Sequence, residues 1–249
     1  MILELDIGNS RIKWRHKSLL NGDVLAEGVF TDELEFIAAS SQSEKPEIFR
    51  YSSVGDPELA EKIVAWSRES WNLEPLAAEV SRHCDGLTIN YPDISRLGVD
   101  RWLAMLAGFH RARGACLIID SGTAFTLDAI AADGNHLGGF ILPGLALMQQ
   151  SLFANTAIRL SSEAKFNSTS LGNSTEEAIF NGSAAGLVAL VEKEMARLSA
   201  LEGESQLIFT GGDAQILKDL CEVEQAEIVP GLVLDGLAIA CPNHRQATQ

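Results

Sequence analysis

The sequence predicts an α/β fold in which one arrangement of strands and helices occurs twice. Each half begins with closely spaced strands and continues with alternating helices and strands. Each half also carries Asp-x-Gly at the end of its first strand, as Asp6-Ile7-Gly8 and as Asp120-Ser121-Gly122. The repeated order and the repeated turn predict a duplicated chain of two domains, residues 1–95 and residues 96–249.

Turn and cap residues place the elements of the first half. Strands are expected at Ile2–Asp6, Arg11–Arg15 and Val24–Phe30, the last two joined by Asn21-Gly22-Asp23. A helix near Asp32–Ala39 and a strand at Glu47–Ser52 follow. Asp56 and Pro57 then predict the N-cap and the first residue of a helix. A weaker strand around Leu76–Val80 ends this half.

The second half repeats the order. Strands are expected at Ala115–Asp120, Ala124–Ala131 and His136–Leu142, with a hairpin turn at Asp133-Gly134-Asn135. Helices are expected after Pro143-Gly144, over Ser174–Leu201, over Asp213–Cys221 and up to Cys241, with strands at Gln206–Thr210 and Ala226–Val229 between them. The connection at 93–114 also has a helical pattern, so no flexible linker is expected between the halves.

Composition limits the classes of function. The chain has 34 acidic against 19 basic side chains and a net charge of −15, with no basic stripe, which argues against a nucleic-acid partner. An acidic protein can still bind ATP, because backbone N–H groups and a divalent ion supply positive potential locally. The four cysteines are scattered without a Cys-x-x-Cys pair, and the apolar stretches are too short to span a bilayer. A cytoplasmic protein with no membrane partner is expected.

The two Asp-x-Gly turns are the first candidates for chemistry. Glycine lets backbone N–H groups approach a ligand, and the carboxylate can hold a hydrated cation. Asp and Gly are also ordinary turn residues, and one isolated instance would favour that interpretation. Two instances at matching places favour a pair of phosphate-binding turns. The chain lacks both the dinucleotide-binding glycine pattern and the P-loop pattern, so neither of those sites is expected.

Three further segments are ambiguous. Asp100, in Gly98-Val99-Asp100-Arg101, is either a helix N-cap or a carboxylate that accepts a proton from a substrate hydroxyl, with Arg101 beside it for an anion. Gly211-Gly212 before Asp213 is either a tight turn with an N-cap or a surface for a flat ligand. Ser174 with Glu177 predicts a capping box, and Thr175 could also offer its hydroxyl to a ligand.

Taken in order, these segments resemble the type III pantothenate kinase family. The resemblance covers nearly the whole chain and rests on four segments: Asp6-x-Gly8-Asn9-Ser10, Gly98-x-Asp100-Arg101, Asp120-x-Gly122-Thr123 with Gly138-Gly139 and Pro143-Gly144 after it, and Thr175-x-x-Ala178-Ile179 leading to Gly182. Each segment alone is weak, and the four in sequence are specific. The family belongs to the superfamily of acetate and sugar kinases, heat-shock chaperone ATPases and actin. The resemblance therefore implies a duplicated βββαβαβα, ribonuclease H-like fold with an interdomain cleft.

The resemblance also implies roles for single residues. ATP and its phosphates would be bound by Thr123 and by the first turn, which comprises Asp6, Ile7, Gly8, Asn9, Ser10, Arg11, Ile12 and Lys13. Asp6 would hold hydrated Mg²⁺, and Asp120 would help hold a monovalent cation, K⁺ or NH₄⁺. Asp100 would be the catalytic base. Pantothenate would be contacted by Tyr91, Gly98, Val99, Asp100, Arg101 and Thr175.

The implied reaction transfers the γ-phosphoryl group of ATP to the primary hydroxyl of pantothenate, the first step of coenzyme A biosynthesis. The resemblance further implies a homodimer. Two alternatives remain at this point. One is another sugar or small-alcohol kinase of the same superfamily, and the other is a non-catalytic regulatory protein on the same scaffold.

Overall fold

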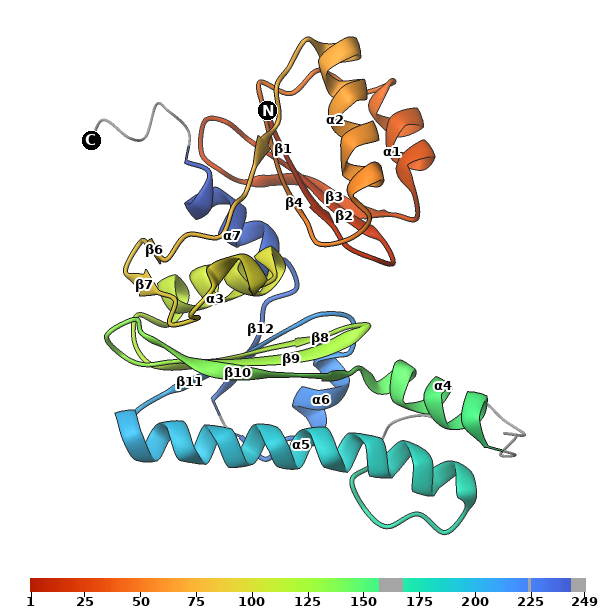
Figure 1. Ribbon diagram of the computed structural model, residues 1–249, viewed down its shortest axis with the longest axis vertical. Helices are drawn as coiled ribbons and strands as arrows, with labels where there is room; N and C mark the ends of the chain where they lie inside the picture. The colour runs from red at the N-terminus through yellow and green to blue at the C-terminus, as the bar shows by residue number, and fades with distance from the viewer. Residues whose placement is uncertain (157–167, 224, 243–249) are drawn as a thin grey trace. The chain divides into compact units, whose positions relative to one another are not determined.

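The computed structural model describes residues 1–156, 168–223 and 225–242. Figure 1 shows the elements in chain order. The strands are β1 Ile2–Ile7, β2 Ile12–Lys17, β3 Val24–Phe30, β4 Ile48–Ser53, β5 Leu76–Ala77, β6 His83–Cys84, β7 Leu87–Thr88, β8 Cys116–Ser121, β9 Ala124–Ile130, β10 His136–Pro143, β11 Gln206–Thr210 and β12 Ala226–Ile228. The helices are α1 Glu33–Ser40, α2 Pro57–Trp71, α3 Val99–Ala112, α4 Leu145–Asn155, α5 Thr175–Glu202, α6 Ala214–Leu220 and α7 Leu232–Ala240, with a short 3₁₀ helix at Ile94–Arg96.

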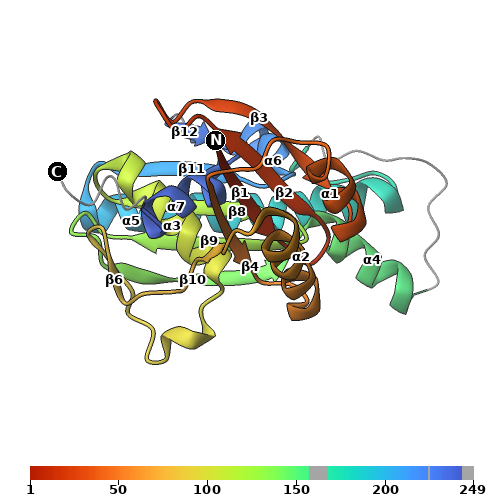
Figure 2. The ribbon, with the colours of Figure 1, turned by 90° about the horizontal axis from the view of Figure 1, so that it is seen from above.

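The duplication is visible in the order of the strands. One sheet has the order β3-β2-β1-β4-β5 and the other has the order β10-β9-β8-β11-β12. In each, the first strand pairs antiparallel with the second and parallel with the fourth. Figure 2 shows β3, β2, β1 and β4 lying side by side in this order. Two five-stranded sheets of one topology confirm the predicted fold class.

The chain divides into two compact units. Unit 1 contains residues 1–85, 91–107 and the described residues from 232 onward, whereas unit 2 contains 86–90 and 108–231. The chain therefore returns to unit 1 with α7 after unit 2 is complete. Compactness is a different criterion from the internal repeat that suggested residues 1–95 and 96–249, and those boundaries stay a prediction.

In unit 1, both faces of the sheet are covered. The odd-numbered side chains of β1, Leu3, Leu5 and Ile7, pack with Phe36 of α1 and Ile63 of α2. The even-numbered side chains point to the opposite face because direction alternates along a strand, and α7 packs there (Figure 1). All residues of β1 are buried, as expected for a strand covered on both sides.

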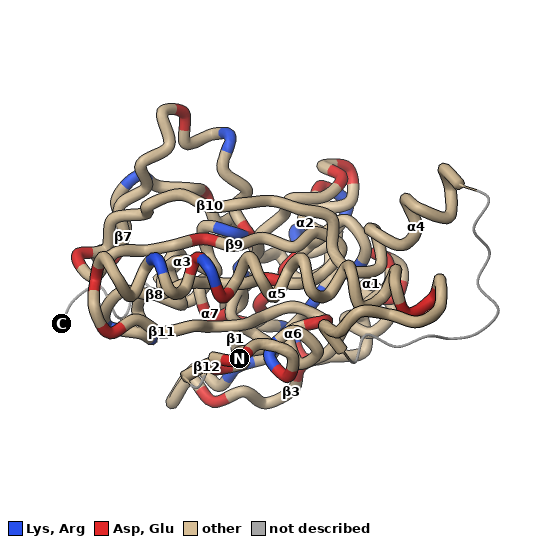
Figure 3. The backbone as a smooth tube through the Cα atoms, turned by 90° about the horizontal axis from the view of Figure 1, so that it is seen from below, with Lys and Arg blue, Asp and Glu red and all other residues tan. Residues whose placement is uncertain are grey.

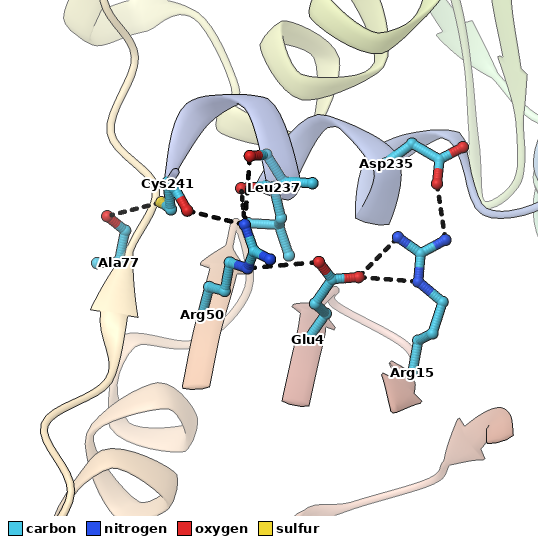
Figure 4. Close-up of polar contacts among 8 residues, drawn as sticks. Glu4, Arg15, Arg50, Ala77, Asp235, Leu237 and Cys241 are labelled. Carbon is cyan, nitrogen blue, oxygen red and sulfur yellow. Dashed lines mark hydrogen bonds and ion pairs between the residues drawn. The ribbon is translucent and has the colours of Figure 1, made fainter. Parts of the chain in front are cut away.

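A buried ionic cluster attaches α7 to this second face (Figure 4). Glu4 is 0% exposed and lies opposite Arg15 of β2 and Arg50 of β4. Its carboxylate is 2.6 Å from Nη2 of Arg15 and 3.4 Å from Nε of Arg50. Arg15 also donates to Asp235 of α7 at 2.7 Å. Arg50 donates to the carbonyl of Cys241, directly after the helix, at 2.8 Å. One glutamate thus orients two arginines, and both hold α7.

In unit 2 the sheet packs against two helices. Leu117 and Ile119 of β8 pack with Leu187 of α5 and Leu217 of α6, and these helices cover one face of the sheet (Figure 1). The opposite face receives the end of α3, where a Cβ on Gly108 would lie 2.2 Å from the side chain of Ile118. Glycine at this position lets the helix approach the sheet closely.

Most predicted elements are present, with boundaries shifted by a few residues. β11 matches its predicted range, and Asp56 caps α2 by accepting from the N–H of Glu58. β2 begins at Ile12 rather than Arg11, and it continues to Lys17. The strand predicted at Leu76–Val80 contains only Leu76–Ala77, since little of it pairs with β4. The β6–β7 pair was not predicted.

Candidate active site

In unit 1 the Asp6 carboxylate lies in a row of polar side chains across three strands. Asp6 of β1 is opposite Lys13 of β2 and Ser52 of β4. The hydroxyl of Ser52 donates to Oδ1 of Asp6 at 2.9 Å. Burial raises the pKa of Asp6, while the Lys13 charge and the Ser52 hydrogen bond oppose that rise. The row holds a buried carboxylate beside one positive charge.

The turn after Asp6 is tight and partly exposed. The N–H of Gly8 donates to the carbonyl of Arg11 at 3.1 Å, which closes the turn between β1 and β2. Gly55, after β4, approaches so closely that a Cβ on it would lie 2.8 Å from the Gly8 carbonyl oxygen. Asn9, Ser10 and Arg11 are exposed at the tip. The turn is therefore supported from one side and open to solvent at its polar residues.

Two of the residues in this predicted segment have buried side chains. Ile7 and Ile12 belong to the core beneath α1 and α2. Within an ATP site they could contribute only backbone groups. Lys13 is half-buried, and its charge acts on Asp6.

Asp100 lies in the first turn of α3. The helix begins at Val99, so the interpretation of Asp100 as its N-cap is wrong: the residue is inside the helix. Its Oδ1 accepts a hydrogen bond from the backbone N–H of Arg101 at 2.7 Å. The negative charge of Asp100 also raises the pKa of Asp6. This effect is smaller than the rise caused by burial and smaller than the lowering caused by Lys13 and by Ser52. Two carboxylates of unit 1 are therefore close enough to interact.

Gly98 leaves space for the Asp100 carboxylate. A Cβ at position 98 would lie 2.6 Å from Oδ1 of Asp100, a distance at which one group must move. We expect Gly98→Ala to displace the carboxylate and reduce kcat by about 10- to 100-fold, since small misplacements of reacting groups have effects of this size. Steady-state kinetics with each substrate varied would measure the change.

Gly186→Ala is the matched control. Gly186 lies in α5, and nothing is within 4 Å of its added Cβ. The alanine should leave kcat unchanged and stabilise the helix by about 1 kcal/mol. A Gly98→Ala enzyme with wild-type kcat would show that the position of the Asp100 carboxylate is unimportant.

The structure brings two predicted substrate residues of unit 1 together. The guanidinium of Arg101 donates through Nη1 to the Tyr91 hydroxyl at 3.2 Å and lies 6.0 Å from the centre of its ring. Arg101 is only 7% exposed, while Tyr91 is half-buried. Arg101 lies in the first turn of α3, directly after Gly98, Val99 and Asp100, and Tyr91 contacts it there. An anionic group of a substrate would find a fixed cation here.

The second Asp-x-Gly turn, in unit 2, is formed by different contacts. The N–H of Gly122 donates to the carbonyl of Ala124 at 2.9 Å, and the N–H of Gly144 donates to that of Thr123 at 2.9 Å. Thr123 is exposed and Asp120 is half-buried. Asp120 belongs to the same alternating set as Ile118, on the sheet face opposite α5 and α6.

Gly211 presses against Asp120. It has a φ of +93°, and a Cβ there would lie 2.5 Å from Oδ1 of Asp120 and 2.3 Å from the Ser121 carbonyl oxygen. The Gly211-Gly212 segment is thus a tight turn against the end of β8. Asp213 is the N-cap of α6 by position, with no side-chain capping hydrogen bond. Oδ1 of Asp120 and the Ser121 carbonyl oxygen, which accepts from the N–H of Asp213 at 2.9 Å, both lie beside Gly211.

Thr175 is the first residue of α5 and is exposed. The predicted cap is confirmed, because the Ser174 hydroxyl accepts from the N–H of Glu177 at 3.1 Å. Glu177 returns the contact by accepting from the N–H of Asn173 at 2.7 Å. Thr175 is therefore an exposed residue at the start of a long helix of unit 2.

Sequence reasoning missed Ser52 and Gly55. Both become visible only when β4 is aligned beside β1, because register decides which side chain of β4 meets Asp6. The segment Ser52-Ser53-Val54-Gly55 follows an apolar stretch and has no turn signal linking it to residue 6. The one usable signal in this segment is a small polar residue at the end of the strand predicted at Glu47–Ser52.

Some further findings concern the described residues as a whole. They include no group of three or more His, Cys, Asp or Glu side chains arranged to hold a metal ion. No helix among them is long and apolar enough to cross a membrane. Figure 3 shows acidic and basic positions interspersed along the backbone.

Solved structures with similar folds fit the duplicated topology. A Baf family transcriptional activator from Campylobacter jejuni matches with a TM-score of 0.62 and 22% identity, over 94% of each chain. A protein from Sinorhizobium meliloti described as a 2-dehydro-3-deoxygalactonokinase matches with a TM-score of 0.50 and 15% identity, over 96% of this chain and 98% of that one. At these identities the likeness concerns the fold alone.

Sequence comparisons are more specific. The model of the type III pantothenate kinase family matches residues 2–197. The type III pantothenate kinase of Ectopseudomonas mendocina is 41% identical, over 97% of this chain and 99% of its own length. That of Pseudomonas fluorescens strain SBW25 is 43% identical over the same shares. The chain therefore belongs to the type III pantothenate kinase family.

Proposed function

We propose that this protein phosphorylates pantothenate with ATP and that Asp100 and Asp6 perform different parts of the reaction. Membership of the family over nearly the full length makes the chain an ATP-dependent phosphotransferase acting on pantothenate. The observation that carries the division of roles is the different setting of the two carboxylates: Asp6 is buried in the sheet and accepts from Ser52, whereas Asp100 lies in the first turn of α3. Two nearby carboxylates can serve separately as base and as metal ligand.

Asp100 is the proposed base. Its position in the first turn of α3 and its hydrogen bond from the Arg101 N–H hold the carboxylate in one orientation. It would orient the primary hydroxyl of pantothenate and accept its proton as the oxygen attacks the γ-phosphorus. Phosphoryl transfer depends mainly on such positioning and on neutralising charge.

Pantothenate would bind around the start of α3. Its carboxylate matches the buried cation of Arg101, which the Tyr91 hydroxyl orients. Gly98 and Val99 would contribute backbone contacts, and Thr175 would contribute a hydroxyl. A carboxylate-bearing alcohol suits this set better than a hexose, which carries no charge for Arg101 to bind.

ATP and Mg²⁺ would be bound by the first turn. The segment from Asp6 to Lys13 offers the N–H groups of its tip and the Lys13 charge to phosphate oxygens, and Thr123 is a further proposed ATP contact. Mg²⁺ usually keeps several waters and uses only one or two carboxylates plus substrate phosphates, which fits a single carboxylate such as Asp6. When bound, the ion neutralises charge on the phosphates during transfer.

A monovalent cation is proposed beside Asp120. The close approach of Gly211 to Oδ1 of Asp120 and to the Ser121 carbonyl supports a compact set of oxygen atoms there. K⁺ or NH₄⁺ at this position would balance the Asp120 charge. Activity would then depend on which monovalent cation the buffer contains.

We expect ATP consumption to require pantothenate and to be at least several-fold faster in potassium or ammonium than in sodium. Coupled measurement of ADP release, with pantothenate present or omitted, tests both statements in one assay. Asp120→Asn should weaken the potassium response, while Asp133→Asn, in an exposed turn of the same unit, should keep it. Equal rates in sodium alone would contradict the cation role of Asp120.

The same assay separates the remaining alternatives. Phosphorylation of a hexose but not of pantothenate would indicate a sugar kinase of the superfamily. ATP binding without turnover on any small alcohol would indicate a regulatory protein.

We also propose a homodimer as the working unit and the cytoplasm, where ATP is available, as the location.

A further inference from the structure

Ser52 is the residue that touches the Asp6 carboxylate directly. It is 1% exposed, and its hydroxyl donates to Oδ1 of Asp6 at 2.9 Å. The contact joins two parallel strands, because Asp6 and Ser52 are register partners of β1 and β4. A serine hydroxyl carries one hydrogen, so it fixes one carboxylate oxygen and leaves the second for other ligands.

The adjacent row of the same sheet face shows the contrast. Two residues earlier on β1, Glu4 is held between the guanidiniums of Arg15 and Arg50 and is 0% exposed. Both of its oxygens are used in ion pairs. The Asp6 row has the same three-strand arrangement but places Lys13 and Ser52 in the two flanking positions. Asp6 keeps 8% exposure.

From this contrast we propose that Ser52 is a positioning residue, which orients the Asp6 carboxylate so that one oxygen stays available to the hydrated magnesium ion of Mg-ATP. The flanking residues decide whether a carboxylate on this face is structural or reactive. Both oxygens of Glu4 face arginines, Oε2 through a hydrogen bond from Arg15 and Oε1 through an ion pair with Arg50. A lysine charge and one neutral donor hold Asp6 without saturating it.

Serine suits this position for a physical reason. A carboxylate buried without a hydrogen bond would be strongly destabilised, and the free side chain would also rotate about its terminal torsion, which has a broad minimum. An arginine guanidinium in place of Ser52 would remove both problems but would also compete with the metal ion for Asp6. A hydroxyl orients the carboxylate and adds no charge.

This inference rests on the proposed role of Asp6 in the kinase, and its test uses metal-dependent nucleotide binding as well as turnover. The variants are Ser52→Ala, which removes the donor, and Ser52→Thr, which keeps it. Ser67→Ala is the matched control, since Ser67 is also a fully buried serine of unit 1 and donates to the Val64 carbonyl at 2.8 Å. Titration calorimetry would measure ATP affinity with magnesium and with EDTA.

We expect Ser52→Ala to raise the magnesium concentration for half-maximal activity by about tenfold, the size expected for a hydrogen bond to a charged group. ATP affinity should fall in magnesium and stay unchanged in EDTA, and the KM for pantothenate should stay close to its wild-type value. Ser52→Thr should restore the magnesium dependence. Ser67→Ala should leave it unaltered.

A folded Ser52→Ala protein whose magnesium dependence lies within twofold of wild type would overturn the proposal. An equal shift in Ser67→Ala would overturn it as well, because the effect would then be one of general packing. If Ser52→Ala does not fold, the magnesium dependence of Ser52→Cys, whose thiol is a weaker donor, is compared with that of wild type and Ser67→Ala instead. If magnesium-dependent ATP binding changes in the Ser52 variants but no pantothenate is phosphorylated, the positioning role of Ser52 is supported. The same result would contradict pantothenate as the substrate.

Discussion

Replacing Asp100 with asparagine is expected to lower kcat for pantothenate phosphorylation by about 10²- to 10⁴-fold, the usual contribution of a general base. The amide has nearly the same shape, so it can still accept the hydrogen bond from the Arg101 N–H. It cannot accept a proton from the substrate hydroxyl. The fold and the affinity for ATP should therefore persist while turnover is lost.

Single-turnover measurements of the chemical step, with ATP affinity determined in parallel, would check this expectation. Asp23→Asn is a suitable control, because Asp23 lies in the exposed turn between β2 and β3. Asp100→Asn also removes a charge that helps to raise the pKa of Asp6, so the pKa of Asp6 should fall. An asparagine variant with near-normal turnover would exclude Asp100 as the base.

Replacing Glu4 with glutamine is expected to destabilise unit 1 by about 3–5 kcal/mol. Glu4, Arg15 and Arg50 are all nearly inaccessible to water. Removing the one carboxylate that both arginines contact would leave two buried positive charges facing a neutral amide. Removing one partner of a buried ion pair has a far larger effect than removing the exposed partner of a surface pair.

Tryptophan fluorescence during urea unfolding would measure this effect in unit 1, since Trp14, Trp66, Trp71 and Trp102 all belong to that unit. Glu33→Gln supplies the comparison. Glu33 pairs with the exposed Lys62 at 3.0 Å, and its loss should leave the free energy of unfolding close to the wild-type value. Similar midpoints for Glu4→Gln and wild type would mean that the cluster contributes little to stability.

Local signals predicted much of the fold. Asp56 and Pro57 mark the start of α2, Ser174 marks the start of α5, and the Gly134 turn joins β9 and β10. Each depends on residues close together in the sequence, where caps and turns are specified. The repeated Asp-x-Gly turns likewise predicted that both sheets would have one topology.

Features that depend on distant partners were not predictable in this way. Register alone places Ser52 opposite Asp6. Only packing shows that Gly211 presses on Asp120. The N-cap interpretation of Asp100 failed for a local reason, because aspartate is favoured both at the cap and within the first turn of a helix.

The return of the chain to unit 1 with α7 has a consequence for biosynthesis. Arg15 and Arg50 leave the ribosome early, but Asp235 and the carbonyls at the end of α7 emerge only after all of unit 2 has been made. At about 5–20 residues per second, that interval is roughly ten to thirty-five seconds. During it, the face of β1 that carries Glu4 and Asp6 lacks the cover that α7 provides. The first sheet is therefore covered on both faces only when translation has passed α7.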